Sequence, residues 1–173
     1  MSQFTYVEMC CDLDPDEIPA GDVPSIDNLV VKPAEGFSPE ELYGCYTSAF
    51  SAGDAKFYQL QGEEERRRYF EQELGFPNVL TNPASMVYKI GEEIIGFSLV
   101  HSYLENNYHI SCMCISPDYQ NLGLGKSMLC RVKRIALENG CQSITLGTEP
   151  DMKAFYLYSQ NGFFVTDEHM VEM

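Results

Sequence analysis

The stretch YHISCMCISPDYQNLGLGK, residues 108–126, decides how this chain of 173 residues folds. Residues 108–115 are rich in β-branched, aromatic and sulfur-containing side chains, which favour a buried or half-buried strand. The strand ends before Pro117, because proline cannot donate to a strand ladder. Beyond the glycines, apolar residues take a helical period over residues 127–138, and an Asn-Gly pair stops that helix. The stretch therefore predicts a strand, a turn, a glycine-rich loop and a helix.

The loop between this strand and this helix, residues 120–127, has the features of an anion-binding site. Gly123 and Gly125 let the backbone turn tightly and approach a ligand closely. Free N–H groups at a helix N-terminus attract anions with the help of the helix dipole, and Lys126 adds a positive charge. The loop therefore predicts a phosphate site, although a tight strand-to-helix turn with glycines for packing explains the same short motif.

Two common phosphate loops do not fit this sequence. A P-loop requires a glycine at position 120, which is Gln. A dinucleotide-binding loop requires a third glycine where Met128 stands. The pattern that fits in full is Gln/Arg-x-x-Gly-x-Gly/Ala, which runs from Gln120 to Gly125.

The composition indicates a globular domain with a strongly acidic surface. Hydrophobic residues make up 45% of the chain, the net charge is −15 and the pI is about 4.4. An acidic surface argues against nucleic-acid binding and would steer cationic partners toward the protein. No apolar run approaches the roughly 18 residues that span a membrane, and the N-terminus lacks a basic, apolar export signal. We expect a cytoplasmic protein that binds neither nucleic acid nor membrane.

The chain has seven cysteines but no Cys-x-x-Cys pair. This argues against a zinc knuckle and a thioredoxin-type site, so no metal is expected. Most of the cysteines are expected to be small buried hydrophobic residues in a reducing compartment. The acidic segment at residues 12–17 lacks the glycine and glutamate of a calcium loop, and we interpret it as a solvated loop.

The rest of the chain predicts further strands and helices. Strands are expected at residues 4–11, 28–32, 86–90, 94–103, 143–148, 163–166 and 170–173. Ser38 and Glu41 form a capping box at the start of one helix. Two more helices are expected over residues 63–74 and 151–160.

The loop pattern resembles the coenzyme A pyrophosphate loop of the GCN5-related N-acetyltransferase (GNAT) family. The lead into it, residues 115–119, resembles the family's hydrophobic-x-Pro-x-Tyr. DMKAFYLYSQNGF, residues 151–163, resembles Asn-x-x-Ala-x-x-Leu-Tyr-x-x-x-Gly-Phe. The resemblance implies an α/β (α+β) fold with a mixed, mostly antiparallel sheet, flanked by helices and splayed at the acetyl-CoA site. It covers one domain, residues 28–173, after an N-terminal extension, residues 1–27, of uncertain structure.

The resemblance also implies where acetyl-CoA binds. Backbone groups of Met113 and Ile115, on either side of Cys114, would pair with the pantetheine arm and the acetyl carbonyl. Backbone N–H groups of the loop would hold the pyrophosphate. The loop residues expected at the cofactor are Gln120, Asn121, Leu122, Gly123, Leu124, Gly125, Lys126 and Ser127. Asp151 stands where the family has an asparagine that helps to hold the pantetheine arm, so this contact is in doubt.

By the same resemblance, the acetyl group would pass directly from coenzyme A to an amine of a small molecule or peptide. Tyr158 matches the family's tyrosine that protonates the departing thiolate, and a packed core aromatic is the alternative. His109, on the central strand, could accept the amine proton because the ordinary pKa of histidine is about 6.5. Glu149, Glu105 and a base acting through water are the rivals.

A second function class stays open beside the acetyltransferase. A module that binds acyl-CoA and senses it without turnover would keep the same loop, and Asp151 in place of asparagine is the feature that favours it. The sequence does not name the acceptor amine, and it leaves a homodimer open.

Overall fold

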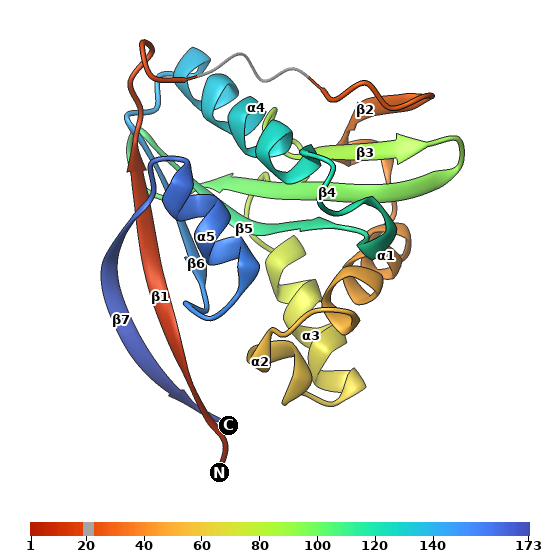
Figure 1. The fold of residues 1–173 in the computed structure, drawn as a ribbon, viewed down its shortest axis with the longest axis vertical. Helices are drawn as coiled ribbons and strands as arrows, with labels where there is room; N and C mark the ends of the chain where they lie inside the picture. Colours follow the sequence, from red (N-terminus) through yellow and green to blue (C-terminus); the bar gives the residue numbers. More distant parts are fainter. Residues whose placement is uncertain (19–22) are drawn as a thin grey trace.

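The computed structural model describes residues 1–18 and 23–173, which form one seven-stranded sheet with helices on both faces (Figure 1). The strands are β1 (Gln3–Asp12), β2 (Leu29–Pro33), β3 (Met86–Ile90), β4 (Glu93–Ser102), β5 (Asn107–Ile115), β6 (Ser143–Thr148) and β7 (Phe164–Glu172). The helices are α1 (Pro39–Ser51), α2 (Lys56–Gln59), α3 (Glu63–Leu74), α4 (Leu124–Glu138) and α5 (Lys153–Gln160), with 3₁₀ turns η1 (Ala34–Gly36) and η2 (Pro117–Tyr119).

The order of strands across the sheet is β2-β3-β4-β5-β6-β1-β7. All neighbouring strands are antiparallel except β5 and β6, which are parallel. Their ladder pairs Asn107–Ile110 with Ser143–Leu146 and then stops, although β5 continues to Ile115 and β6 to Thr148. The two central strands therefore splay apart beyond the ladder. This confirms the predicted mixed, mostly antiparallel and splayed sheet.

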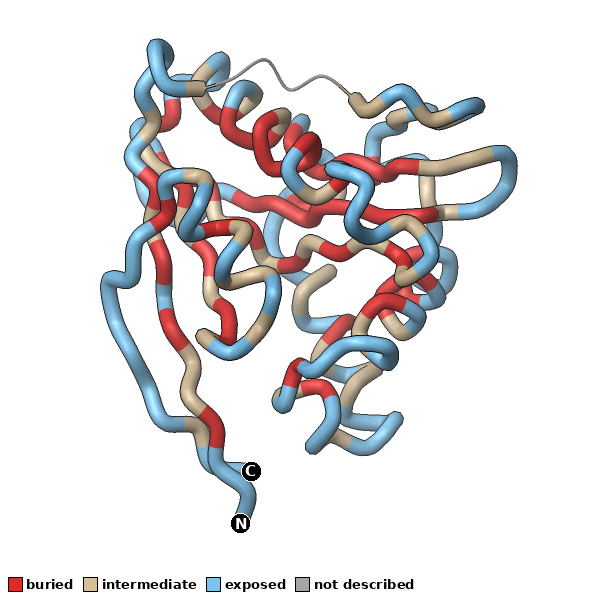
Figure 2. Tube along the Cα trace, viewed as in Figure 1, coloured by how far each residue is buried: buried red, intermediate tan, exposed pale blue. Residues whose placement is uncertain are grey.

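Each face of the sheet carries its own hydrophobic core. On one face α4 and α5 contribute Leu124, Met128, Leu129, Val132, Ala136 and Tyr158. On the other face α1, α2 and α3 contribute Leu42, Tyr46, Tyr58 and Phe70. β5 supplies Ile110 to the first core and Cys112 and Cys114 to the second, because a β-bulge at Ser111, where the pairing passes from Val100–Ile110 to Leu99–Cys112, shifts the alternation of the strand by one residue. The buried residues follow the central strands and the inner faces of the helices, whereas β7 is almost wholly exposed (Figure 2).

The N-terminal segment contributes a strand to this sheet. The strand expected at residues 4–11 forms as β1, which lies between β6 and β7 and pairs with both. Ser2 and Met173 exchange two backbone hydrogen bonds of 3.1 and 3.0 Å, so the two termini lie side by side (Figure 1). The part of the N-terminal extension at residues 19–22 lies outside the described residues.

Sequence patterns within and next to each helix predicted most of the helices correctly. The capping box forms, with the Glu41 N–H donating to Ser38 Oγ at 3.2 Å and the Ser38 N–H donating to Glu41 Oε2 at 2.7 Å. The bounds of α3 are those expected, Glu63–Leu74. No helix in the described part of the chain has the length and apolarity needed to cross a membrane.

The larger differences from the expectations concern two helix starts, one strand and one additional helix. The glycine-loop helix begins at Leu124 and not at residue 127, because the left-handed Gly123 ends the loop directly before it. The last helix begins at Lys153 and not at residue 151. The two closing strands are one strand, β7, because β1 pairs with it along almost its whole length. The short helix α2 was not expected from the sequence.

Candidate active site

The splay between β5 and β6 is an opening in the middle of the sheet. The first residues beyond the ladder are Ser111 on β5 and Gly147 on β6. Tyr6 of β1 reaches this opening, because a Cβ atom on Gly147 would overlap the Tyr6 hydroxyl and ring. Gly147 therefore lets a phenol cross β6 at the point where the sheet opens.

The glycine-rich loop has a free row of backbone N–H groups. Asn121 and Gly123 take left-handed backbone conformations, with φ of 63° and 82°. The first N–H group bonded inside α4 is that of Ser127, which donates to the Gly123 carbonyl at 3.0 Å. Within residues 1–18 and 23–173, no acceptor contacts the N–H groups of residues 121–126. These groups and the helix dipole together suit a phosphate.

Some side chains of the loop hold it in place, whereas Lys126 is exposed to solvent. The Gln120 amide donates to the Ile115 carbonyl at 2.9 Å and so ties the loop to the end of β5. Ser127 is buried, and its Oγ lies 2.9 Å from the Tyr88 hydroxyl. Leu124 is buried in the core, whereas Lys126 is exposed beside the free N–H groups.

Helix α5, which carries Tyr158, packs against this loop. A Cβ atom on Gly125 would lie 3.2 Å from Cδ2 of Leu157, so the second glycine of the loop packs directly against α5. Tyr158 is only 6% exposed, and its ring centroid lies 5.7 Å from that of Phe163. Burial raises the pKa of Tyr158, and Cys112, Cys114 and Tyr6 shift it in the same direction. The phenol therefore keeps its proton at neutral pH.

The splayed strands, the free N–H groups and the buried tyrosine all lie in a stretch of sequence that matches a known protein family. Residues 42–163 match the acetyltransferase (GNAT) family. The chain belongs to this family. The match includes the glycine-rich loop and Tyr158.

Solved GNAT structures share the fold at low sequence identity. A GCN5-related N-acetyltransferase from Sphaerobacter thermophilus has a TM-score of 0.67 and 18% identity, covering 97% of this chain and 51% of that one. The PaiA N-acetyltransferase of Thermoplasma acidophilum, in complex with coenzyme A, has a TM-score of 0.63 and 16% identity, covering 80% of this chain and 91% of that one. The chain thus spans about half the length of the Sphaerobacter protein. No curated protein matches the sequence.

The residues expected to bind the pantetheine arm lie at the opening between β5 and β6. Met113 and Ile115 are partly buried on β5 beyond the end of the β6 ladder, and Cys114 is buried on the opposite face. Asp151 lies just before α5, but it is exposed and forms an ion pair of 3.3 Å with Lys56.

The three residues considered as the general base occupy different environments. His109 lies inside the ladder, where its Nδ1 is 2.8 Å from Thr145 Oγ1. Burial, followed by the nearby His101, lowers the pKa of His109 to about 4. Glu149 is only 2% exposed, and its two oxygens accept the backbone N–H groups of Lys56 and Phe57 at 3.0 and 3.1 Å. Glu105 is exposed in the turn before β5, at the far end of that strand from Ile115.

Sequence reasoning missed a fourth candidate, the carboxyl group of Glu73 on α3. Its side chain lies beside Tyr69 of the same helix and beside Ser111, the first β5 residue of the opening. Burial raises the pKa of Glu73 to about 7, and hydrogen bonding from Ser111 and Tyr69 acts in the opposite direction. Its spacing could have revealed it, because Glu73 follows the packed residues Tyr69 and Phe70 by four and three positions and so shares their face of the helix.

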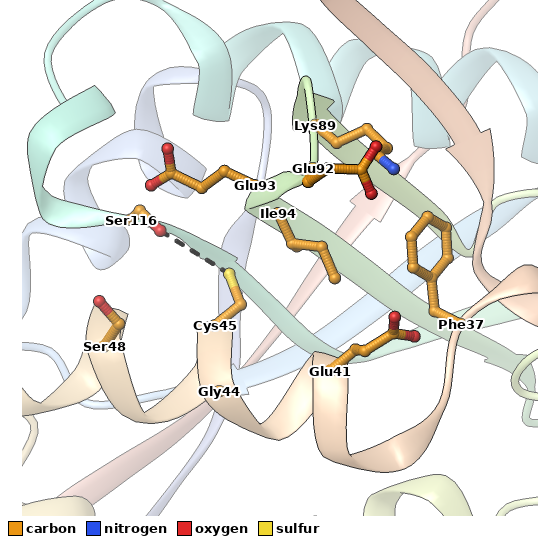
Figure 3. Close-up of a pocket in the computed structure, with 10 residues that line it drawn as sticks. All are labelled: Phe37, Glu41, Gly44, Cys45, Ser48, Lys89, Glu92, Glu93, Ile94 and Ser116. Carbon is orange, nitrogen blue, oxygen red and sulfur yellow. Dashed lines mark hydrogen bonds between the residues drawn. The ribbon is translucent and has the colours of Figure 1, made fainter.

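A pocket of about 360 Å³ lies on the other side of β5, between α1 and the β3–β4 hairpin (Figure 3). It carries the carboxylates of Glu41, Glu92 and Glu93 against the single ammonium of Lys89. In Figure 3 the Cys45 thiol of α1 reaches toward the Ser116 hydroxyl at 3.9 Å. The excess of negative charge makes this pocket unsuitable for the phosphates of coenzyme A.

Glu73→Gln is expected to stabilise the protein at alkaline pH. The folded state raises the pKa of Glu73 from 4.5 to about 7, so it binds a proton that the unfolded chain releases earlier. The contribution of Glu73 to the unfolding free energy is therefore fully present below pH 4.5 and is lost as the pH rises through 7. The shift corresponds to at most about 3 kcal/mol of unfolding free energy.

Denaturant unfolding of both proteins at pH 4.5 and pH 8 measures this effect. The variant should gain about 2 kcal/mol relative to wild type on moving from the lower to the higher pH, after allowance for incomplete burial. Glu71→Gln, which removes an exposed carboxylate from the same helix, is the control and should show no such gain. An equal pH dependence in wild type and Glu73→Gln would show that Glu73 is not held in a desolvated site.

Proposed function

We propose that this chain is an acetyl-CoA-dependent N-acetyltransferase that passes the acetyl group directly to an amine of a small molecule or peptide. The observation that supports this most is the β5–β6 opening, which lies next to the free N–H groups of residues 121–126. The N–H groups would hold the pyrophosphate, and the unpaired edge of β5 near Met113 and Ile115 would accept the pantetheine arm. Fixed backbone donors there would polarise the thioester carbonyl.

Acetyl-CoA would be a co-substrate that brings the activated acyl group. Tyr158 would give its proton to the departing sulfur, because its buried phenol stays protonated and lies near Cys112 and Cys114 on β5. The net charge of −15 would attract cationic acceptors. All seven cysteines are free and most are buried, which suits a reducing compartment such as the cytoplasm.

Coenzyme A and acetyl-CoA are expected to raise the melting temperature, whereas ATP and NAD are not. A ligand that binds only the folded state stabilises it by about 2.7 kcal/mol at a hundredfold excess over its dissociation constant. For a domain of this size the shift in melting temperature is roughly 5 to 10 °C. Differential scanning fluorimetry with the four ligands at equal concentration makes the comparison.

A shift with ATP but none with coenzyme A would contradict the assignment of the loop. A shift with acetyl-CoA, but no thiol release with any amine, would instead support a module that senses acyl-CoA without turnover. Free-thiol detection on the same samples separates these outcomes.

A further inference from the structure

Glu73 and Tyr6 mark the two sides of the β5–β6 opening. Glu73 comes from α3 and lies beside Ser111, the first β5 residue beyond the ladder. Tyr6 comes from β1 and lies on Gly147, the first β6 residue beyond the ladder. Because each side chain stands where its strand becomes free, both are placed to meet a molecule that enters the opening.

Tyr6 also connects Glu73 with the side of the opening that holds Tyr158. The negative charge of Glu73 acts on Tyr6 and helps to raise the pKa of that phenol to about 12, after burial as the main cause. Tyr6 in turn acts on Tyr158. Tyr6 is therefore close enough to interact electrostatically with both Glu73, a carboxyl group, and Tyr158, a phenol that retains its proton.

The competing bases are engaged elsewhere. Both oxygens of Glu149 hold the first turn of α2, and His109 is bonded to Thr145 inside the ladder. The Glu73 carboxyl group, in contrast, lies beside the hydroxyl groups of Tyr69 and Ser111, and the Ser111 hydroxyl gives its one proton to the Leu99 carbonyl at 3.2 Å. Glu73 therefore retains acceptor capacity on its carboxylate.

We propose that Glu73 is the general base that takes a proton from the ammonium group of the acceptor. This rests on the proposed acetyltransferase function and deepens it by naming the residue that takes the proton of the acceptor. An alkyl ammonium has a pKa of about 10.4 and must lose a proton before it can attack, whereas an aromatic amine or an alcohol brings no such charge. The phenol rings of Tyr6 and Tyr69 beside the carboxylate suit a cation of this kind.

The transfer then balances as follows. The ammonium gives one proton to Glu73, and the nitrogen lone pair forms a bond to the acetyl carbonyl carbon. The carbon–sulfur bond breaks, and the sulfur leaves with the electron pair and takes the proton of Tyr158. The nitrogen loses its second proton, which restores the Tyr158 phenol. The products are the acetamide, coenzyme A as the thiol, and one proton, which Glu73 releases to solvent.

The pH dependence of this step follows from the groups around Glu73. The titratable groups that face it are Tyr69 from its own helix and Tyr6 from β1, and Glu8 and Glu149 also act on Tyr6. Both tyrosines stay neutral below pH 10, because burial raises their pKa values. The acid limb of kcat/KM should therefore report Glu73 itself, near pH 7.

The test is the pH profile of kcat/KM with acetyl-CoA and the best acceptor among putrescine, glucosamine and a peptide with a free α-amino group. Wild type should lose activity as the pH falls through about 7. Glu73→Gln should lose roughly a hundredfold in kcat/KM at pH 8 together with the acid limb, the low end for losing a general base. Glu71→Gln removes an exposed carboxylate from the same helix and should keep both the rate and the limb.

A second variant distinguishes catalysis from a structural role. Tyr69→Phe keeps the ring that packs on Phe57, with centroids 5.7 Å apart, but removes a hydroxyl that lowers the pKa of Glu73. Its acid limb should therefore move to higher pH. A limb that stays in place in Tyr69→Phe, or wild-type kcat/KM in Glu73→Gln, would overturn the assignment of Glu73 alone. A wild-type protein that neither binds coenzyme A nor acetylates any of the amines would overturn the proposed function itself.

Discussion

Gly123→Val is expected to abolish the stabilisation of the protein by coenzyme A while leaving it folded. Gly123 has φ of 82°, in the left-handed region where a β-branched residue is strained by roughly 1–3 kcal/mol. The loop should relieve this strain by moving toward an ordinary conformation. The free N–H groups of residues 121–126 would then no longer converge on one phosphate. Titration calorimetry with coenzyme A measures the loss directly.

The other end of the same helix offers a matched control. Gly140 has φ of 81°, and a side chain there would meet open space, so Gly140→Val imposes the same backbone strain away from the loop. Both variants should lose similar unfolding free energy, but only Gly123→Val should lose coenzyme A binding. Wild-type affinity in Gly123→Val, or an equal loss of affinity in both variants, would show that the loop does not hold the cofactor.

Tyr158→Phe should lower kcat by roughly a hundredfold, the low end for losing one general acid. The substitution keeps the ring beside Phe163 and therefore most of the packing. It removes only the proton that would go to sulfur. A thiolate with a pKa near 8.5 leaves moderately well without help, so the loss should be substantial but not complete. Because the chemical step becomes limiting, kcat and kcat/KM should fall together.

Tyr156→Phe is the control for this substitution. Tyr156 lies on the same helix but is 59% exposed, so loss of its hydroxyl should change neither the rate nor the melting temperature. Coenzyme A affinity should be near normal in both variants. Wild-type kcat in Tyr158→Phe, measured where chemistry is limiting, would return Tyr158 to a packing role.

The glycine-rich loop could be predicted from sequence because its signal is local. The residues between Gln120 and Gly125 set both the backbone turn and the N–H groups, so the pattern and the structure coincide. Most strands and the capping box of α1 could be predicted in the same way, but the single strand β7 could not, because its length depends on pairing with β1. The start of α4 was placed too late because the left-handed conformation of Gly123 is not visible in an apolar periodicity.

The proposed general base could not be predicted from the sequence, because long-range packing determines the surroundings of each candidate. Glu149 resembles a candidate at the end of a strand, yet its carboxylate holds α2, which lies more than 90 residues earlier in the chain. Glu73 belongs to the helix EEERRRYFEQEL, in which most carboxylates are exposed, so its charge is typical of a solvated face. Only the contact with Ser111 across the sheet opening distinguishes it.

Acetyl transfer itself is the most direct test of this structure's function. The protein is incubated with acetyl-CoA and the three amines, and mass spectrometry of the acetylated amine is compared with free thiol over time. The expected result is one acetylated primary amine, formed in equal amount to the thiol and absent in Gly123→Val. Thiol without an acetylated amine, or neither product from a protein that binds coenzyme A, would contradict an N-acetyltransferase that acts in the β5–β6 opening.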